Sequence, residues 1–251
     1  MKKVKSENDK LSFKDLLKDK LIKKEFSLLK KSYDLIGNVA ILEIDKGLLK
    51  KKKIIGKAII DTNKHIKSVV RKVGGHEGDY RVQKYEFLVG EKNLETLYKE
   101  SGVSVKLDIR KVYFTPRLSN ERLRVAKAVK KGENVLVMFS GVGIYPFIIS
   151  KYSKAKEIYG VEINPNACKY ADESLRLNKF KNIKLFCGDV RKVVPKLKKK
   201  FDRILMPLPA TSLEFLDLAF KCLKKNGVIH LYCFSEEELI DEVVKYIKKK
   251  A

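Results

Sequence analysis

Several residue types are missing or rare in this chain of 251 residues. It contains no tryptophan, three histidines and four cysteines. Without tryptophan, and with its other aromatic residues scattered, the chain is a poor candidate for a stacking platform that binds single-stranded nucleic acid. The cysteines have no metal-ligand spacing, so we expect no metal site and reduced thiols packed among apolar or helical residues. They are Cys168, Cys187, Cys222 and Cys233.

Long hydrophobic runs are also missing. No apolar stretch approaches the length that spans a bilayer, and the basic N-terminus lacks the apolar core of a signal peptide. We therefore expect a cytoplasmic protein with no membrane partner. We also expect a monomer, although no motif bears on the oligomeric state.

Acidic residues are outnumbered by basic ones. There are 31 Asp and Glu against 56 Lys and Arg, which gives a net charge of +25, and lysine runs occur at 50–53 and 198–200. A heat-adapted composition explains many lysines but not so large an imbalance. An excess of this size indicates a polyanionic partner, because binding to nucleic acid releases condensed counterions.

A candidate cofactor site follows the apolar run at 135–139. This run reads as a buried strand, and it leads into a glycine turn, a helix and a second apolar strand that ends on an acidic residue. Such a turn lets backbone amides approach a ligand closely, and a carboxylate about twenty residues later suits a ribose diol. The candidate cofactor-binding residues here are Phe139, Ser140, Gly141, Gly143 and Glu162.

The dinucleotide fingerprint is incomplete at this turn. Phe147 stands where the third glycine of G-x-G-x-x-G allows tight packing over a pyrophosphate. This disfavours a nicotinamide dehydrogenase and favours S-adenosylmethionine (SAM), a cofactor without a pyrophosphate. A glycine turn with no ligand remains the alternative from these residues alone.

The chain divides into three regions. Residues 1–25 predict a basic helical extension. Residues 26–110 predict a small α+β domain with strands at 38–44, 66–72 and 85–89, a helix at 51–63 and a glycine-rich loop at 74–78. From 111 to 251, strands alternate with helices, with helices at 165–178, 190–197 and 213–223 and strands at 183–186, 201–206 and 228–234. This alternation predicts an α/β domain, a parallel sheet with helices on both faces and ligands at the carboxyl ends of its strands.

Two further strand ends carry candidate residues. Asp189, followed by Val190, can accept the exocyclic amine of an adenine, or it can cap the next helix. After Met206 the segment Pro207-Leu208-Pro209 forms a rigid loop, because each proline fixes φ. A flat base could rest against this loop, and a purely structural turn is the alternative.

Four segments resemble one family in sequence and order. They are Tyr33-Asp34-Leu35-Ile36-Gly37, Gly78-Asp79-Tyr80-Arg81-Val82, Val112-Tyr113-Phe114-Thr115-Pro116-Arg117-Leu118 and Asn120-Glu121-Arg122. The chain is similar over about residues 30–235 to the archaeal and eukaryotic tRNA (guanine-N1)-methyltransferases, which modify guanosine 37, just 3′ of the anticodon. The resemblance implies a class I SAM-methyltransferase (Rossmann-like) domain preceded by a small tRNA-binding domain. It also implies SAM as cofactor and the tRNA anticodon stem-loop as partner.

The resemblance assigns roles to individual residues. Glu121 matches the general base that removes the N1 proton of guanine, and Arg81 matches the arginine that stabilises negative charge on O6. Both roles are chemically sound, since N1 is protonated at neutral pH and a guanidinium is a fixed donor. The expected substrate contacts are Arg117, Pro207, Leu208 and Pro209.

The chain departs from the pattern of that family at three points. Pro207 replaces a common asparagine, as in a subgroup resembling bifunctional enzymes that also methylate C7 of 4-demethylwyosine, whose three rings suit a flatter loop. Val137 replaces an acid at the end of the first strand, so we expect weaker SAM binding. Typical relatives continue beyond the point matching Ala251 and many carry a further N-terminal domain, so we expect recognition to depend on the small domain and on bulk charge.

We therefore predict a SAM-dependent methyltransferase acting at N1 of guanosine 37, and at C7 of 4-demethylwyosine, in wyosine biosynthesis. Two alternatives stay open: a SAM-dependent aminocarboxypropyl transferase of the wybutosine pathway, and a degenerate domain that only binds tRNA. The sequence does not decide between N1, C7 or both, nor which tRNA species are substrates.

Overall fold

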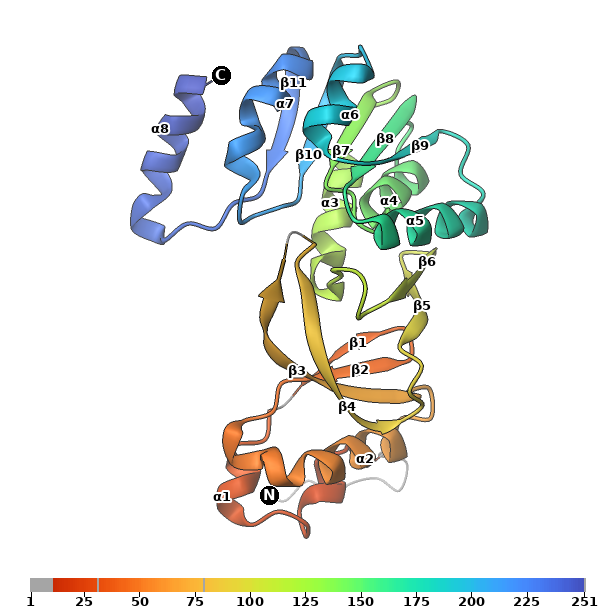
Figure 1. Ribbon diagram of the computed structural model, residues 1–251, viewed down its shortest axis with the longest axis vertical. Coiled ribbons are helices and arrows are strands. Elements are labelled where there is room, and N and C mark those ends of the chain that lie inside the picture. The colour runs from red at the N-terminus through yellow and green to blue at the C-terminus, as the bar shows by residue number, and fades with distance from the viewer. Residues whose placement is uncertain (1–10, 31, 79, 251) are drawn as a thin grey trace, which may run out of the picture. The chain divides into compact units, whose positions relative to one another are not determined.

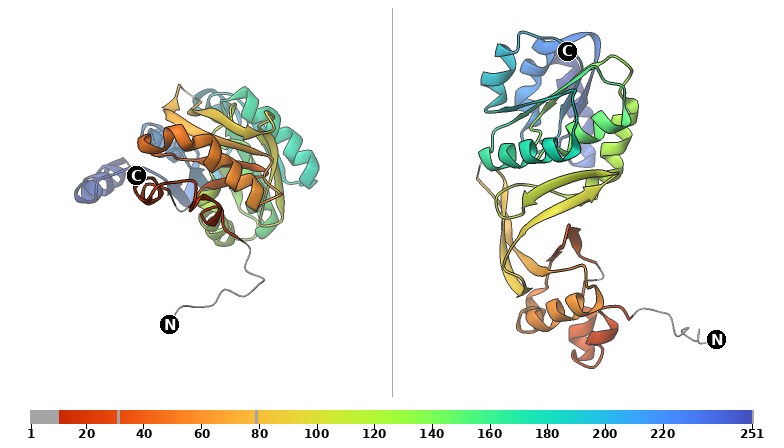
Figure 2. Two further views of the ribbon diagram at one scale, coloured as in Figure 1. Left: turned by 90° about the horizontal axis from the view of Figure 1, so that it is seen from below. Right: turned by 90° about the vertical axis from the view of Figure 1, so that its right-hand side faces the viewer.

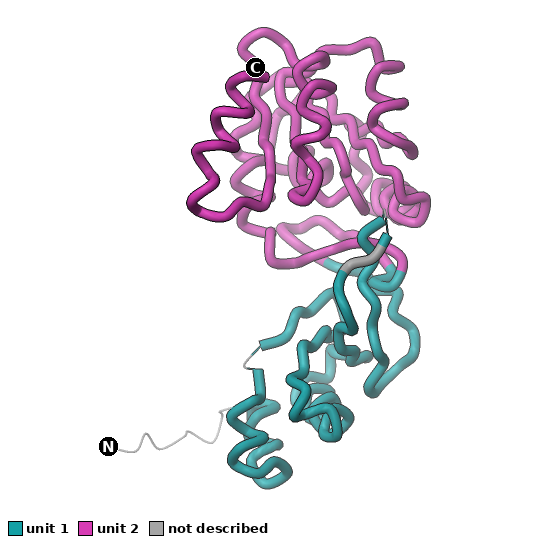
Figure 3. The backbone as a smooth tube through the Cα atoms, turned by 60° about the vertical axis from the view of Figure 1, so that its left-hand side comes forward, with its two compact units in different colours: residues 1–98, 108–110 teal, residues 99–107, 111–251 magenta. Residues whose placement is uncertain are grey.

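The computed structural model describes residues 11–30, 32–78 and 80–250. Residues 1–10 of the predicted extension and Asp79 lie outside the described residues. The chain forms two compact units (Figure 3): unit 1 comprises residues 1–98 and 108–110, and unit 2 comprises residues 99–107 and 111–251. Residues 99–107, which the sequence assigns to the small domain, thus belong to the second unit.

Unit 1 is built around a four-stranded sheet of order β1-β2-β3-β4. The central strands β2 and β3 are parallel and the outer pairs are antiparallel. A 3-10 turn, η2 (Lys46–Lys51), and helix α2 connect the central strands (Figure 1). The elements are β1 (Asp34–Ile36), β2 (Val39–Leu42), α2 (Lys52–Thr62), β3 (Ser68–Glu77) and β4 (Val82–Gly90), preceded by η1 (Asp15–Leu17) and α1 (Lys23–Ser27). Apolar side chains of α2, including Ile55 and Ile59, are buried with Val69 and Leu88 of the sheet.

The predicted glycine-rich loop at 74–78 is wrong as a loop. Strand β3 continues through Gly74 and Gly75, and its pairing with β4 resumes at His76 opposite Gln83 after a shift in register. Gly74 has a φ of 68°, so it supplies the left-handed residue that this bulge requires. The two strands then meet across the short turn that contains Arg81.

A two-stranded sheet follows that the sequence did not predict. It consists of β5 (Glu95–Glu100) and β6 (Val103–Asp108). In β6, Val103, Val105 and Leu107 are buried while the residues between them are partly exposed. This is the period-two pattern of a strand with one covered face.

Unit 2 contains a five-stranded parallel sheet of order β11-β10-β7-β8-β9. The strands are β7 (Asn134–Met138), β8 (Glu157–Glu162), β9 (Ile183–Cys187), β10 (Phe201–Met206) and β11 (Leu223–Leu231). Around them run η3 (Pro116–Leu118), α3 (Ser119–Ala128), α4 (Ile144–Tyr152), α5 (Pro165–Asn178), α6 (Val190–Lys196), η4 (Ser212–Phe215), α7 (Leu216–Cys222), η5 (Glu237–Leu239) and α8 (Ile240–Lys250) (Figures 1 and 2). The predicted fold class is confirmed.

The strand order of unit 2 determines where a ligand can enter. The chain passes from β7 to β8 and β9 on one side and returns to β10 and β11 on the other side of β7. The crossover connections therefore diverge between β7 and β10, which is the switch point where open α/β sheets bind ligands. Alternate residues such as Leu136, Met138 and Ile204 form one core with α6 and α7. In the described ranges, no helix has the length and apolar character needed to cross a bilayer.

Two predicted boundaries in unit 2 need correction. The helix expected at 213–223 is a 3-10 turn followed by the short helix α7. The last strand begins at Leu223, five residues earlier than Val228, and ends at Leu231. The carboxyl end of β11 is thus followed by Tyr232, which leaves the strand at the ligand-binding edge of the sheet.

Candidate active site

The glycine turn after β7 has the geometry of a ligand cradle. Phe139, Gly141 and Gly143 all have positive φ values, of 59°, 55° and 84°. A Cβ atom on Gly143 would lie 2.6 Å from Cζ of Phe147, so only glycine fits there. Gly141 faces open space, because a Cβ atom on it would meet no atom within 4 Å. The Phe147 ring, in the place of the third glycine, packs against Gly143 and not against Gly141.

Glu162 closes this cradle from the end of β8, as the sequence predicts. Its carboxylate accepts hydrogen bonds from the backbone N–H of Gly141 and of Asn164, each at 2.8 Å. Burial raises the pKa of the Glu162 carboxyl, and the two N–H donors oppose that rise. Backbone groups therefore fix both carboxylate oxygens of Glu162 at the glycine turn, while the contact with a ribose diol stays a prediction.

Asp189 follows β9 and caps helix α6. One carboxylate oxygen accepts the N–H of Arg191 at 2.8 Å, and the guanidinium of Arg191 pairs with the same carboxylate. This ion pair holds the pKa of Asp189 below its usual range. The capping alternative is therefore present, while the predicted contact with adenine stays a prediction. Val190, the first residue of α6, is buried.

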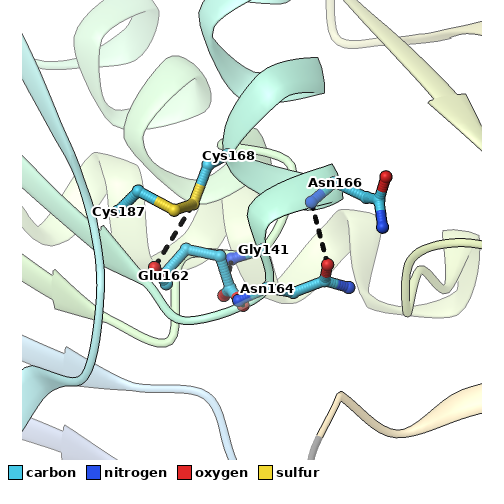
Figure 4. The surroundings of a disulfide bond; sticks show 6 residues. All are labelled: Gly141, Glu162, Asn164, Asn166, Cys168 and Cys187. Atoms are coloured by element: carbon cyan, nitrogen blue, oxygen red, sulfur yellow. Dashed lines mark hydrogen bonds between the residues drawn. A yellow bond between two sulfur atoms is a disulfide. The ribbon is translucent and has the colours of Figure 1, made fainter.

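The expectation of reduced cysteines is wrong for two of the four. Cys168 of α5 and Cys187 at the end of β9 form a disulfide (Figure 4). Cys222 and Cys233 are free. Helix α5 packs on β9 and brings the two Cα atoms to 5.7 Å. The Sγ atom of Cys168 also lies 3.3 Å from the carbonyl oxygen of Glu162.

A small hollow lies beside this disulfide. Ser140 and Glu162 line it together with Asp172, Phe186 and both bridged cysteines. It therefore joins the first three strand ends that the sequence assigns to the cofactor. Within the described residues, no group of three or more His, Cys, Asp and Glu side chains could hold a metal ion.

Glu121 lies in the first turn of α3 and has two different side-chain donors. Arg124, one turn along the same helix, donates from Nε and Nη2 at 2.6 and 2.7 Å. Tyr232, which lies 111 positions later in the sequence, donates its hydroxyl to Oε1 of Glu121 at 2.6 Å. Arg124, and to a smaller extent Tyr232, lower the pKa of Glu121 to about 2.

Tyr232 in turn contacts the helix of the cofactor turn. Its hydroxyl lies 3.4 Å from that of Tyr145, the buried second residue of α4. The sequence analysis did not identify Arg124, Tyr145 or Tyr232. An i, i+3 spacing could have indicated Arg124, but no local signal links Tyr232 with a residue 111 positions earlier.

The fourth strand end is a backbone-braced loop. Met206 is buried, and Leu208 donates its N–H to the Met206 carbonyl at 2.9 Å. The carbonyl of Pro209 accepts the N–H of Phe234 at 3.1 Å. These two hydrogen bonds brace the segment that begins with Pro207, and its contact with a base stays a prediction.

The remaining predicted residues are Arg117 in unit 2 and Arg81 in unit 1. Arg117 belongs to η3 and is exposed, and its backbone N–H donates to Oγ1 of the capping residue Thr115 at 3.3 Å. A buried ion pair between Arg122 and Glu100 fixes this segment, since Arg122 also donates to the Thr115 carbonyl. Arg81 belongs to unit 1, where it has a φ of 51° in the turn between β3 and β4. Its catalytic role stays a prediction.

Comparison with known protein families gives two adjoining matches. The model of the TRM5/TYW2 methyltransferase domain matches residues 96–251, and that of the TYW2 N-terminal domain matches residues 13–93. The tRNA (guanine(37)-N(1))-methyltransferase Trm5b of Pyrococcus abyssi is 43% identical over 206 residues, which cover 82% of this chain and 61% of that relative. The chain thus spans less than two thirds of that relative's length.

Two further relatives extend the comparison. The tRNA (guanine(37)-N(1))/4-demethylwyosine(37)-methyltransferase Taw22 of Nanoarchaeum equitans is 34% identical, over 86% of this chain and 88% of its own. A crystal structure of Trm5b from Pyrococcus abyssi superposes with a TM-score of 0.83 at 39% identity, over 92% of this chain and 69% of that one. TYW2 of Pyrococcus horikoshii in complex with MeSAdo superposes with a TM-score of 0.78 at 29% identity, over 94% and 85%.

Proposed function

Because the chain belongs to the TRM5/TYW2 methyltransferase family, we propose that it methylates the purine at position 37 of tRNA in the cytoplasm, with SAM as cofactor. The targets are N1 of guanosine and C7 of 4-demethylwyosine. The observation that carries this proposal is the carboxylate of Glu121, which is linked through Tyr232 and Tyr145 to the helix of the glycine turn.

The residues of the cofactor cradle suit SAM. Open space above Gly141 admits a ligand, and Glu162 presents carboxylate oxygens for a ribose diol. When bound, SAM supplies an electrophilic methyl group on a sulfonium. We assign the ribose to Glu162 and the adenine to the end of β9, at Asp189 and Val190. The turn residues Phe139, Ser140, Gly141 and Gly143, with Met206, complete the cradle.

Glu121 performs the proton transfer in this proposal. The N1–H bond of guanine breaks, the proton passes to the Glu121 carboxylate, and the nitrogen lone pair becomes available to the methyl group. A carboxylate with a pKa of about 2 is a weak base. The side chain of Arg124 is 62% exposed, so a tRNA phosphate can pair with its guanidinium in place of Glu121. The pKa of Glu121 then rises, which makes the carboxylate a stronger base.

The other roles follow from the family resemblance. Arg81 stabilises negative charge on O6, and Arg117 contacts the substrate. Pro207, Leu208 and Pro209 form an apolar wall without a side-chain hydrogen-bond donor, which suits the tricyclic base. The similarity to Taw22 of Nanoarchaeum equitans, whose name covers both reactions, supports the bifunctional assignment.

The test is methyl transfer from labelled SAM to two tRNAs, one with unmodified guanosine 37 and one with 4-demethylwyosine, followed by nucleoside analysis. We expect 1-methylguanosine from the first tRNA and a C7-methylated tricycle from the second, and loss of both in Glu121→Gln. Label on guanosine alone contradicts the bifunctional assignment. A product that has gained an aminocarboxypropyl group, or tRNA binding without transfer, contradicts the proposed methylation.

A further inference from the structure

We propose that Tyr232 is a positioning residue for the transfer reaction: its phenol hydroxyl holds the Glu121 carboxylate in the orientation that accepts the proton of the base. This inference rests on the proposed function and assigns a role within that site to a residue that the motifs of the chain do not identify.

The contact itself is short and comes from a distant part of unit 2. The hydroxyl of Tyr232 donates to Oε1 of Glu121 at 2.6 Å. Tyr232 directly follows β11, whose last residue, Leu231, pairs with Met206 at the end of β10. The phenol therefore extends from the carboxyl edge of the sheet, where the cofactor residues also lie, to the first turn of α3.

Two neighbours restrict how Tyr232 can move. Its backbone carbonyl accepts the hydroxyl of Ser212 at 2.5 Å, which ties the residue to η4. Its ring packs against the ring of Tyr145, with centroids 6.4 Å apart, and Tyr145 is only 4% exposed. Tyr145 is two residues after Gly143, so the support of Glu121 is built on the same helix as the cofactor turn.

The second donor to Glu121 is less suited to fixing it. The side chain of Arg124 is 62% exposed, and exposed ion pairs hold their geometry weakly. Arg124 also lowers the pKa of Glu121 more than Tyr232 does. A neutral hydroxyl can orient the carboxylate while withdrawing less of its basicity. The charged or titratable groups that act on Glu121 are Arg124 of α3, His230 of β11 and Tyr232, with Tyr145 of α4 behind Tyr232.

The test replaces the hydroxyl alone. Tyr232→Phe keeps the ring, so we expect the full-length variant to bind SAM and tRNA with unchanged dissociation constants. Its single-turnover rate constant for methyl transfer should fall by roughly tenfold to a hundredfold, because a displaced catalytic group costs about this much. Tyr152→Phe is the matched control. Tyr152 is the last residue of α4, and its phenol hydroxyl donates to the Ser101 carbonyl. The rate constant of this variant should equal that of the wild type.

A second readout does not depend on turnover. A pH titration of the ¹³C-labelled glutamate carboxyls by NMR, assigned with Glu121→Gln, gives the pKa of Glu121 directly. The value should rise in Tyr232→Phe and remain unchanged in Tyr152→Phe. A wild-type rate in Tyr232→Phe, an unchanged pKa, or a loss of rate matched by an equal loss of SAM binding would each overturn the inference. A wild type that transfers no label refutes the proposed function instead, and the titration still tests the contact.

Discussion

At the scale of single residues, the reactivity of Glu121 depends on side chains that the motif does not contain. Removing Arg124 takes away the largest cause of its lowered pKa. In Arg124→Ala we therefore expect the pKa of Glu121 to rise from about 2 toward 4.5, with the carboxylate still ionised at neutral pH. NMR titration of the glutamate carboxyls measures this shift. Arg176→Ala, on the exposed face of α5, removes the same charge elsewhere and should leave the value unchanged; an equal rise in both variants would show a general charge effect instead.

Glu162 gives a prediction about cofactor affinity. Glu162→Gln loses one of the two carboxylate oxygens that we assign to the ribose diol. Since hydrogen bonds to charged groups are worth about 1.5–3 kcal/mol, the dissociation constant for SAM should rise by roughly tenfold to a hundredfold in isothermal titration calorimetry. Glu157→Gln changes the same residue type at the opposite end of β8, where Lys184 and Lys199 pair with it. SAM affinity should be normal in that control, and equal loss in both variants would contradict the assignment.

Individual site residues differ in how far the sequence could predict them. Glu162 and the glycine turn were predictable because a strand, a turn and an acid at fixed spacing form a local pattern. Tyr232 was not, because its contact with Glu121 depends on which strands are neighbours in the sheet. The disulfide was missed for the same reason, since only the packing of α5 on β9 brings Cys168 to Cys187.

At the scale of elements, local signals predicted best where they were strongest. Helix α5 has the predicted ends because Pro165 occupies its first turn, Asn164 caps it, and Lys179 ends it with a φ of 59°. The β5–β6 pair was missed although Val103, Val105 and Leu107 alternate with polar residues. The predicted strand at 66–72 ends before β3 does, because in a sequence the glycines of a bulge cannot be distinguished from the glycines of a loop.

The disulfide between α5 and β9 should stabilise this part of unit 2. It joins residues 19 positions apart, and closing a loop of this size in the unfolded chain contributes about 3 kcal/mol. Under oxidising conditions, Cys187→Ser should lower the free energy of unfolding by about this amount in a denaturant titration. Cys233→Ser, which removes a free thiol, should change it far less. If dithiothreitol leaves the stability of the wild type unchanged, the bridge does not contribute.

At the scale of the whole molecule, net charge is the feature most directly readable from sequence. The net charge of +25 follows from the composition without knowledge of the fold, but it does not identify the residues that contact a partner. In unit 1, Lys53 and Lys57 of α2 are exposed, whereas Lys52 pairs with Glu86. Exposed lysines without such a pair can exchange bound counterions for phosphates at lower cost.

Salt dependence therefore distinguishes a functional basic surface from a merely lysine-rich composition. If tRNA binding uses 6–10 phosphate contacts, the association constant should fall by roughly 10³- to 10⁵-fold between 50 and 200 mM salt. Filter binding over this range measures the slope of log K against log salt. Lys53→Gln should reduce its magnitude by about 1 if that lysine contacts a phosphate. Lys248→Gln on α8 is the charge-matched control. A slope near zero for the wild type would mean that bulk charge reflects composition alone, and equal changes in both variants would mean that charge acts without a defined docking face.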